Sequence, residues 1–183
     1  MKDYLPGTTL ETDWNSPDPL SVLDAVFSAG GLVLSQVSRL TGLEPHTVQN
    51  WVKRGFCSSP VAKQYSIRQF CRLVTINLLK DSLSLPQITD MLSYINNSLA
   101  DESDDAIGDD QLYRYFVTIL KHLDHAAASP AERAQAISLT VKSYVEPYPG
   151  AGKRLERVLN IMLTAYFAAR FKSKAEQMLN NLD

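Results

Sequence analysis

The feature that most constrains this chain is a glycine placed between two short helical segments. Residues 35–41 open with Ser35, a residue type that caps helices. Gly42 then supplies the permissive backbone of a tight turn, and a second helix, residues 45–54, ends at Gly55. Two short helices joined through a glycine-containing turn are typical of a helix-turn-helix.

The segments on either side of this pair are also delimited by glycine, proline and capping residues. An N-terminal helix is expected to begin at Asp18, with a proline at its first position, and to end at Gly30. Residues 56–65 are too broken for a helix and predict a small hairpin, or wing. Ser66 and Pro86 then each begin a further helix with a regular apolar face.

Beyond residue 97 an acidic run precedes a stretch that is helical throughout. The aspartate pairs at 104–105 and 109–110 suggest a solvated linker, and helices are expected over residues 112–128, 130–145 and 153–182. The predicted fold class is therefore all-α, a winged helix-turn-helix with a small wing followed by a helical C-terminal region. Four parts are expected: an N-terminal helical extension (1–33), the winged helix-turn-helix (34–97), an acidic linker (98–110) and a helical region for dimerisation or effector binding (111–183).

Positive charge is confined to one block of the chain. Residues 31–80 carry seven Lys or Arg against one acid, a balance of +6, whereas residues 1–30 and 81–183 each have a balance of -4. A compact basic block favours phosphate binding, since each contact releases counterions from a nucleic acid. A solvated charged face is the alternative.

The second short helix has two distinct faces. Val48, Trp51 and Val52 form an apolar stripe for packing, and the polar residues on another side recur at i, i+3, i+4 and i+7. Glutamine and asparagine side chains can bond the edges of adenine, and lysine or arginine can contact phosphates or guanine. The predicted duplex-DNA readers are His46, Gln49, Asn50, Lys53 and Arg54.

Residues 34–95 resemble the DNA-binding domain of the MerR family of transcriptional regulators. The resemblance rests on Leu34 to Ser38, Leu40 to Leu43, Thr47 and Val48 through Trp51 to Phe56, Tyr65 and Ser66, the helix with Phe70, Leu73, Ile76 and Leu79, and the run from Leu83 to Ile88 with Met91 and Leu92. It implies a winged helix-turn-helix whose second helix enters the major groove, with a homodimer reading two half-sites. The whole layout resembles a bacterial family of uncharacterised predicted transcriptional regulators.

The resemblance has departures that bear on base preference. Family members usually carry Arg then Tyr where this chain has Gln49 and Asn50, and their longer wing ends in an Arg-containing motif matched here only by Lys63. Supporting phosphate contacts are expected from Ser35, Arg39, Thr47, Lys63, Tyr65 and Arg68, with surface solvation or, for Tyr65, core packing as the alternative.

The remaining features argue against other classes of protein. No apolar run reaches the roughly 18 residues of a membrane span and no signal stretch opens the chain, so a cytoplasmic protein is expected. Cys57 and Cys71 form no metal or disulfide pattern, and His122 with His125 lack a third ligand. Neither an enzyme nor a cofactor or metal site is therefore predicted.

Two questions stay open at this level. The last helix has an apolar face that includes Phe167 and Phe171, which is expected to pack within the chain, with a dimer interface as the alternative. An effector pocket lined by Tyr113, Tyr115, Phe116 and Tyr166 is conceivable, although no small-molecule effector is identified. The competing hypothesis for the whole chain is a protein-interaction module on a MerR-like fold that no longer binds DNA.

Overall fold

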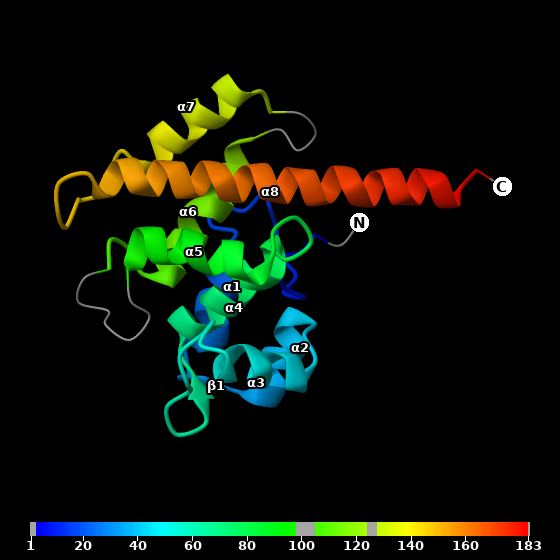
Figure 1. Ribbon diagram of the computed structural model, residues 1–183, viewed down its shortest axis with the longest axis vertical. Coiled ribbons are helices and arrows are strands. Elements are labelled where there is room, and N and C mark those ends of the chain that lie inside the picture. Colours follow the sequence, from blue (N-terminus) through cyan, green and yellow to red (C-terminus); the bar gives the residue numbers. More distant parts are fainter. Residues whose placement is uncertain (1–2, 98–104, 124–127, 183) are drawn as a thin grey trace.

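The computed structural model describes residues 3–97, 105–123 and 128–182. Within these residues the chain is mostly helical and contains one two-stranded sheet (Figure 1). The helices are α1 (Ser21–Phe27), α2 (Leu34–Thr41), α3 (Pro45–Lys53), α4 (Ile67–Leu79), α5 (Leu85–Asn96), α6 (Asp109–His122), α7 (Pro130–Val141) and α8 (Ala151–Asn180). The strands are β1 (Leu32–Val33) and β2 (Gln64–Tyr65).

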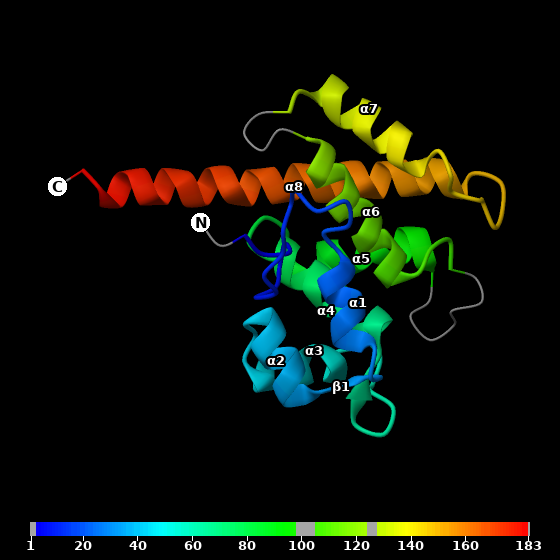
Figure 2. The same cartoon turned by 180° about the vertical axis from the view of Figure 1, so that it is seen from behind.

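Helix α4 lies at the centre of the molecule. From Phe70 to Leu79 it buries every side chain except that of Asn77, which is half-buried. Figures 1 and 2 show α2, α3 and the sheet at one end of the molecule and α8 lying across the other, with α7 on the outer side of α8. The sheet end and the α8 end are therefore separate surfaces joined by one core.

Several helix starts follow directly from serine capping. Ser66, Ser84 and Ser129 each accept a hydrogen bond from the backbone N–H three residues later, and a Gln or Glu at that position reaches back to the serine N–H. The predicted helix start at Ser66 is confirmed. The cap predicted at Ser35 is wrong, because α2 begins at Leu34 and the side chain of Gln36 accepts the Val33 N–H at 2.9 Å.

The sheet joins two segments that the sequence analysis had separated. Leu32 pairs with Tyr65 and Val33 with Gln64 in antiparallel register. The prediction of a hairpin formed within residues 56–65 is therefore wrong: this segment holds a tight turn with a Val61–Gln64 bridge and one strand, β2, whose partner β1 precedes α2 inside the segment predicted as an N-terminal extension. Gly31 allows this pairing, since a Cβ there would lie 2.9 Å from the Tyr65 carbonyl oxygen.

The predicted solvated linker is wrong where the structure describes it. Residues 98–104, Asp104 among them, lie outside the described residues. Ala106 and Ile107 are buried, Asp109 opens α6, and the Asn96 side chain bonds both the N–H and the carbonyl of Ile107. Helix α6 consequently packs against α4 as part of one core, because these apolar contacts and hydrogen bonds hold the segment before its first turn in place.

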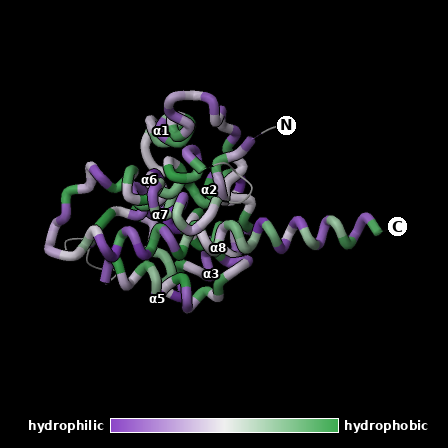
Figure 3. Tube along the Cα trace, turned by 90° about the horizontal axis from the view of Figure 1, so that it is seen from above, coloured by the Kyte–Doolittle hydropathy of each residue, from purple (hydrophilic) through white to green (hydrophobic). Residues whose placement is uncertain are grey.

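Helix α8 is partly core and partly exposed. Leu155, Val158, Leu159, Met162 and Leu163 are fully buried, whereas Phe171 is 56% exposed, so its predicted inward packing is wrong. Figure 3 shows the C-terminal part of α8 extending alone beyond the other elements. None of the described helices combines the length and apolar character needed to cross a membrane.

Candidate nucleic-acid interface

Helices α2 and α3 are held by a tight turn and a shared apolar contact. Gly42 adopts φ 69°, the left-handed conformation that glycine favours at helix ends. Thr41 closes the turn, since its hydroxyl donates to the Val37 carbonyl at 2.8 Å and accepts the Leu43 N–H at 3.2 Å. Val37 and Leu43 are buried, so this turn fixes the angle between the two helices.

Helix α3 divides into a buried side and a polar outer side, as predicted. Val48 is fully buried and Trp51 is 4% exposed. The residues on the other side are exposed to solvent: His46, Gln49, Asn50 and Lys53. Burial of Trp51 anchors the helix, and its polar side is thereby presented outward as a rigid surface.

A groove of about 740 Å³ runs between α3, the start of α2 and the hairpin. Five of the predicted site residues line it: Ser35, Gln49, Lys53, Lys63 and Tyr65. The rest of the lining is mainly apolar: Val33, Leu34, Pro45, Val52 and Pro60. Gln49 and Lys53 of α3 and Lys63 of the 61–64 turn thus line one concave surface, which combines two ammonium groups with one amide.

The tip of the hairpin has a conformation unusual for its residues. Ala62 and Lys63 have φ values of 49° and 64°, and the Gln64 N–H donates to the Val61 carbonyl at 2.9 Å. Two successive positive φ angles are what a type I′ turn requires, and Asn or Gly normally occupies these positions. The local conformation is therefore strained, and it holds the exposed Lys63 side chain at the rim of the groove.

Several other predicted contacts do not line the groove. Arg39 and Asn50 are exposed, and Thr47 is half-buried. Arg54 is exposed and its guanidinium lies 4.8 Å from the centre of the Phe56 ring. This cation–π contact orients a positive charge at the end of α3.

Two of the predicted contact residues, Arg68 and Tyr65, make other interactions within the protein. Arg68 forms an ion pair with Asp105, which argues against its predicted role as a phosphate contact. Tyr65 is only 3% exposed, and burial raises the pKa of its hydroxyl. Tyr65 is therefore part of the groove wall, and its burial favours the core-packing alternative over a phosphate contact.

A buried ion pair that was not predicted, between Arg72 and Asp109, lies next to the segment that follows α3. The Arg72 guanidinium lies 3.3 Å from Asp109 in α6, and its Nε–H donates to the Phe56 carbonyl at 2.8 Å. Burial raises the pKa of Asp109, an effect that Arg72 opposes. The sequence did contain a signal for this ion pair: Arg72 lies within an otherwise apolar stretch of α4, and a buried arginine needs a buried acidic partner.

The candidate nucleophiles and metal ligands form no convergent site in the described residues. Burial raises the pKa of the Cys57 thiol to about 12 and that of Cys71 further still. His122 bonds the Thr118 carbonyl through Nδ1 at 2.7 Å, while His125 lies outside the described residues. Across the described part of the chain, no three His, Cys, Asp or Glu side chains are grouped to hold a metal ion.

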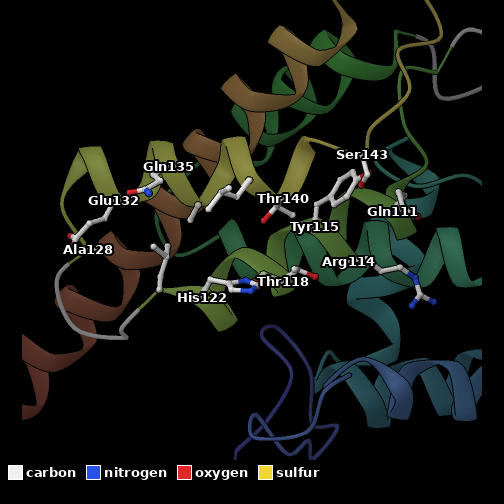
Figure 4. Close-up of a pocket in the computed structure, with 13 residues that line it drawn as sticks. Gln111, Arg114, Tyr115, Thr118, His122, Ala128, Glu132, Gln135, Thr140 and Ser143 are labelled. Atoms are coloured by element: carbon white, nitrogen blue, oxygen red, sulfur yellow. The ribbon is translucent and has the colours of Figure 1, made fainter.

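A second cavity, of about 930 Å³, lies between α6 and α7 (Figure 4). Tyr115, His122, Glu132 and Gln135 line it. Of the aromatic residues predicted for an effector pocket, Tyr115 alone is in this lining, since Tyr113 and Phe116 are fully buried and Tyr166 packs against Phe116. The charged groups here are engaged: Arg114 pairs with Asp24, and Glu132 caps α7.

Comparison with known proteins identifies the family. Residues 21–116 match the family model described as "Domain of unknown function (DUF1836)". The chain is also similar to "Uncharacterized protein YkrK" of Bacillus subtilis (strain 168), with 30% identity over 96 residues, 50% of this chain and 41% of that relative. The chain thus spans about two fifths of the length of this curated relative, and no solved structure matches it. Since the matched segment covers more than half of its residues, the chain belongs to the DUF1836 family.

Proposed function

We propose that this protein binds duplex DNA through a winged helix-turn-helix formed by α2, α3 and the β1–β2 sheet with the turn at residues 61–64, and that it acts as a transcriptional regulator. The observation that carries the proposal is the convergence of Gln49, Lys53 and Lys63 on one exposed groove. Helix α3 has the diameter that the major groove accepts, and its outer side presents amide and ammonium groups. Lys63, at the tip of the hairpin, is suited to a backbone phosphate beside it.

The distribution of free charge supports the same face. Two of the seven basic residues between 31 and 80, Arg68 and Arg72, are paired with acids. Four of the other five are exposed on or beside α3: Arg39, Lys53, Arg54 and Lys63. Internal pairing therefore leaves the positive charge concentrated at the sheet end of the molecule.

A dimer is part of the proposal, because two such faces would read a palindromic operator. If each copy contributes four phosphate contacts, the logarithm of the affinity should fall with the logarithm of salt concentration with a slope of about -7. A monomer with the same contacts would give a slope of about half that value.

The test is selection from a random duplex pool, followed by fluorescence anisotropy across a salt series. The variant is Gln49→Ala with Asn50→Ala and Lys53→Ala. Its matched control changes the same residue types at exposed sites away from α3: Gln135→Ala, Asn160→Ala and Lys153→Ala. Enrichment of a palindrome, with binding abolished in the first variant and kept in the control, would support the proposal.

Equal binding by both variants would place any DNA contact elsewhere and would contradict the role of α3. Absence of binding by the wild type at low salt would reject DNA binding altogether. Because the control removes the same charge, a difference between the variants reports position and not net charge.

One observation favours a second candidate, docking of a protein partner. Val33 is 41% exposed in β1 beside the groove, and Val61 is 80% exposed at the hairpin. Apolar side chains around a groove are typical of peptide-binding surfaces. The two candidates differ in salt dependence: peptide docking would persist at salt concentrations that abolish DNA binding, and Val33→Ser would weaken it selectively.

A further inference from the structure

The C-terminal part of α8 has an apolar side that nothing in the described chain covers. The last buried residue of the helix is Phe167. Beyond it Phe171, Met178 and Leu182 are 56%, 63% and 78% exposed. The last part of the helix extends past the body of the molecule (Figures 1 and 3), although a short isolated helical segment is marginal in water.

These exposed residues follow the spacing of a coiled coil. Along α8 they alternate in steps of four and three residues: Thr164, Ala168, Phe171, Ala175 and Met178, followed by Leu182 two residues beyond the end of the helix. A mean repeat of 3.5 residues keeps a stripe facing one partner helix along its whole length. By helical spacing this stripe, here called the α8 seam, lies on the side opposite the face that packs Leu155, Leu159 and Met162 into the core.

Large and small residues alternate along the seam in such an order that a second, antiparallel copy of the seam places a small residue opposite each large one. We propose that a second copy of this chain pairs antiparallel on the α8 seam, with the two-fold axis at Ser173. Phe171 then faces the partner's Ala175, Met178 faces the partner's Ala168, and Leu182 faces the partner's Thr164. Each layer combines one large and one small side chain, which is how close packing is achieved between facing helices.

The parallel alternative packs poorly. In parallel register Phe171 would meet the partner's Phe171 while Ala175 met the partner's Ala175. Such layers alternate between overcrowding and a void, and both defects are costly. The order of residues along the seam therefore favours a reversed second copy over a parallel one.

The size of the seam sets the expected strength of the dimer. The paired segment, Thr164 to Leu182, is about 28 Å long at 1.5 Å per residue. A two-helix contact of this length is at the small end of specific interfaces, and a dissociation constant in the micromolar range is expected, on the order of 1–50 µM.

The charges beside the seam give the dimer a salt dependence of its own. Lys172 and Lys174 flank it, and near the two-fold axis they approach the partner's Lys172 and the partner's Lys174. Arg170 and Glu176 lie on sides of the helix away from it. Screening of the lysine repulsion should strengthen pairing as salt rises, opposite to the trend expected for DNA binding.

The seam faces away from the core and α2 and α3 lie at the other end of the molecule, so this pairing is a contact separate from the arrangement of two α3 helices on one operator. Its test involves no DNA, so this proposal and the proposed function can fail independently. Sedimentation equilibrium of the full chain, from roughly 1 to 200 µM, should show a reversible dimer of the 20.4 kDa subunit. Phe171→Ala leaves two voids and Ala175→Phe overcrowds two layers, so each should weaken dimerisation by about tenfold or more.

The double variant Phe171→Ala with Ala175→Phe is the decisive measurement. It restores one large and one small residue to each central layer of an antiparallel pair, so its dissociation constant should return to within about threefold of the wild type. Gln177→Ala, on the side of α8 away from the seam, is the matched control and should leave dimerisation unchanged. Circular dichroism checks that every variant remains helical.

A monomer throughout this concentration range would overturn the proposal. A dimer insensitive to Phe171→Ala would do the same by placing the contact elsewhere. A double variant as weak as the single variants would reject the antiparallel register.

Discussion

Arg72 on α4 and Asp109 in the first turn of α6 form a buried ion pair, with 3.3 Å between the guanidinium Nη1 and the carboxylate Oδ1. Their side chains are only 6% and 10% exposed. Because Arg72 also donates to the Phe56 carbonyl, one guanidinium joins the end of the α3 segment to α4 and α6. The candidate interface and the C-terminal helices are thus connected through a single side chain.

Removing this arginine should be costly to stability. Arg72→Ala leaves the Asp109 carboxylate buried without its partner, and the free energy of unfolding is expected to fall by about 3–5 kcal/mol. The control Lys153→Ala, which also removes one positive charge at an exposed position of α8, should change it by less than about 0.5 kcal/mol. Urea unfolding followed by circular dichroism measures both, and equal losses would contradict the structural role of the pair.

The same pair predicts how stability depends on pH. Burial raises the pKa of Asp109 in the folded protein above its unfolded value of 3.8, so folding favours its protonated form. Its contribution is complete below pH 3.8 and is lost as pH rises through the folded pKa. Asp109→Asn should therefore remove part of the decline in unfolding free energy above about pH 4. Identical slopes for the variant and the wild type would show that the folded pKa is not raised.

The strained hairpin turn offers a stabilising substitution. Ala62 has a φ of 49°, which glycine adopts without steric cost. Ala62→Gly should raise the free energy of unfolding by up to about 1 kcal/mol. The same change at Ala134, on an exposed side of α7, should instead lower it by about 0.5–1 kcal/mol. A fall in stability for Ala62→Gly, measured by thermal or urea unfolding, would argue against the left-handed conformation at the turn.

Both thiols should be unreactive in the folded state. Cys57 is 1% exposed with its pKa raised to about 12, and Cys71 is fully buried. A thiol reagent at pH 8 is expected to label neither residue in the native protein and both in denaturant, since the thiolate is the reactive form. Rapid labelling under native conditions would mean that the region around α4 opens readily.

Two basic side chains next to the candidate interface should behave differently in DNA binding. Lys63 is exposed at the groove, so Lys63→Ala should weaken binding to duplex DNA by about threefold to tenfold and reduce the salt slope by about one per copy. Arg68 is paired with Asp105, so Arg68→Ala should change the unfolding free energy and leave the salt slope unchanged. The reverse result, from anisotropy titrations, would move the phosphate contacts to the start of α4.

Most helices of the fold could be predicted from the local sequence. Ser66 marked the start of α4 and Gly42 marked the turn between α2 and α3, because capping and turn signals act over a few neighbouring residues. The two sides of α3 were predictable for a related reason. Helical periodicity alone separates Val48 and Trp51 from Gln49 and Lys53.

Contacts between distant segments were decided only by the tertiary structure. The pairing of Leu32 with Tyr65, and of Arg72 with Asp109, joins residues more than thirty positions apart. The local sequence does not indicate which acidic side chain pairs with which basic one. The aspartates at 105, 109 and 110 were therefore predicted to belong to a solvated linker, and Arg68 was predicted to contact a phosphate. Charge composition located the basic block at residues 31–80. The tertiary packing decided which of its Lys and Arg side chains form ion pairs with acidic side chains, because a buried ion must be paired and an exposed one need not be.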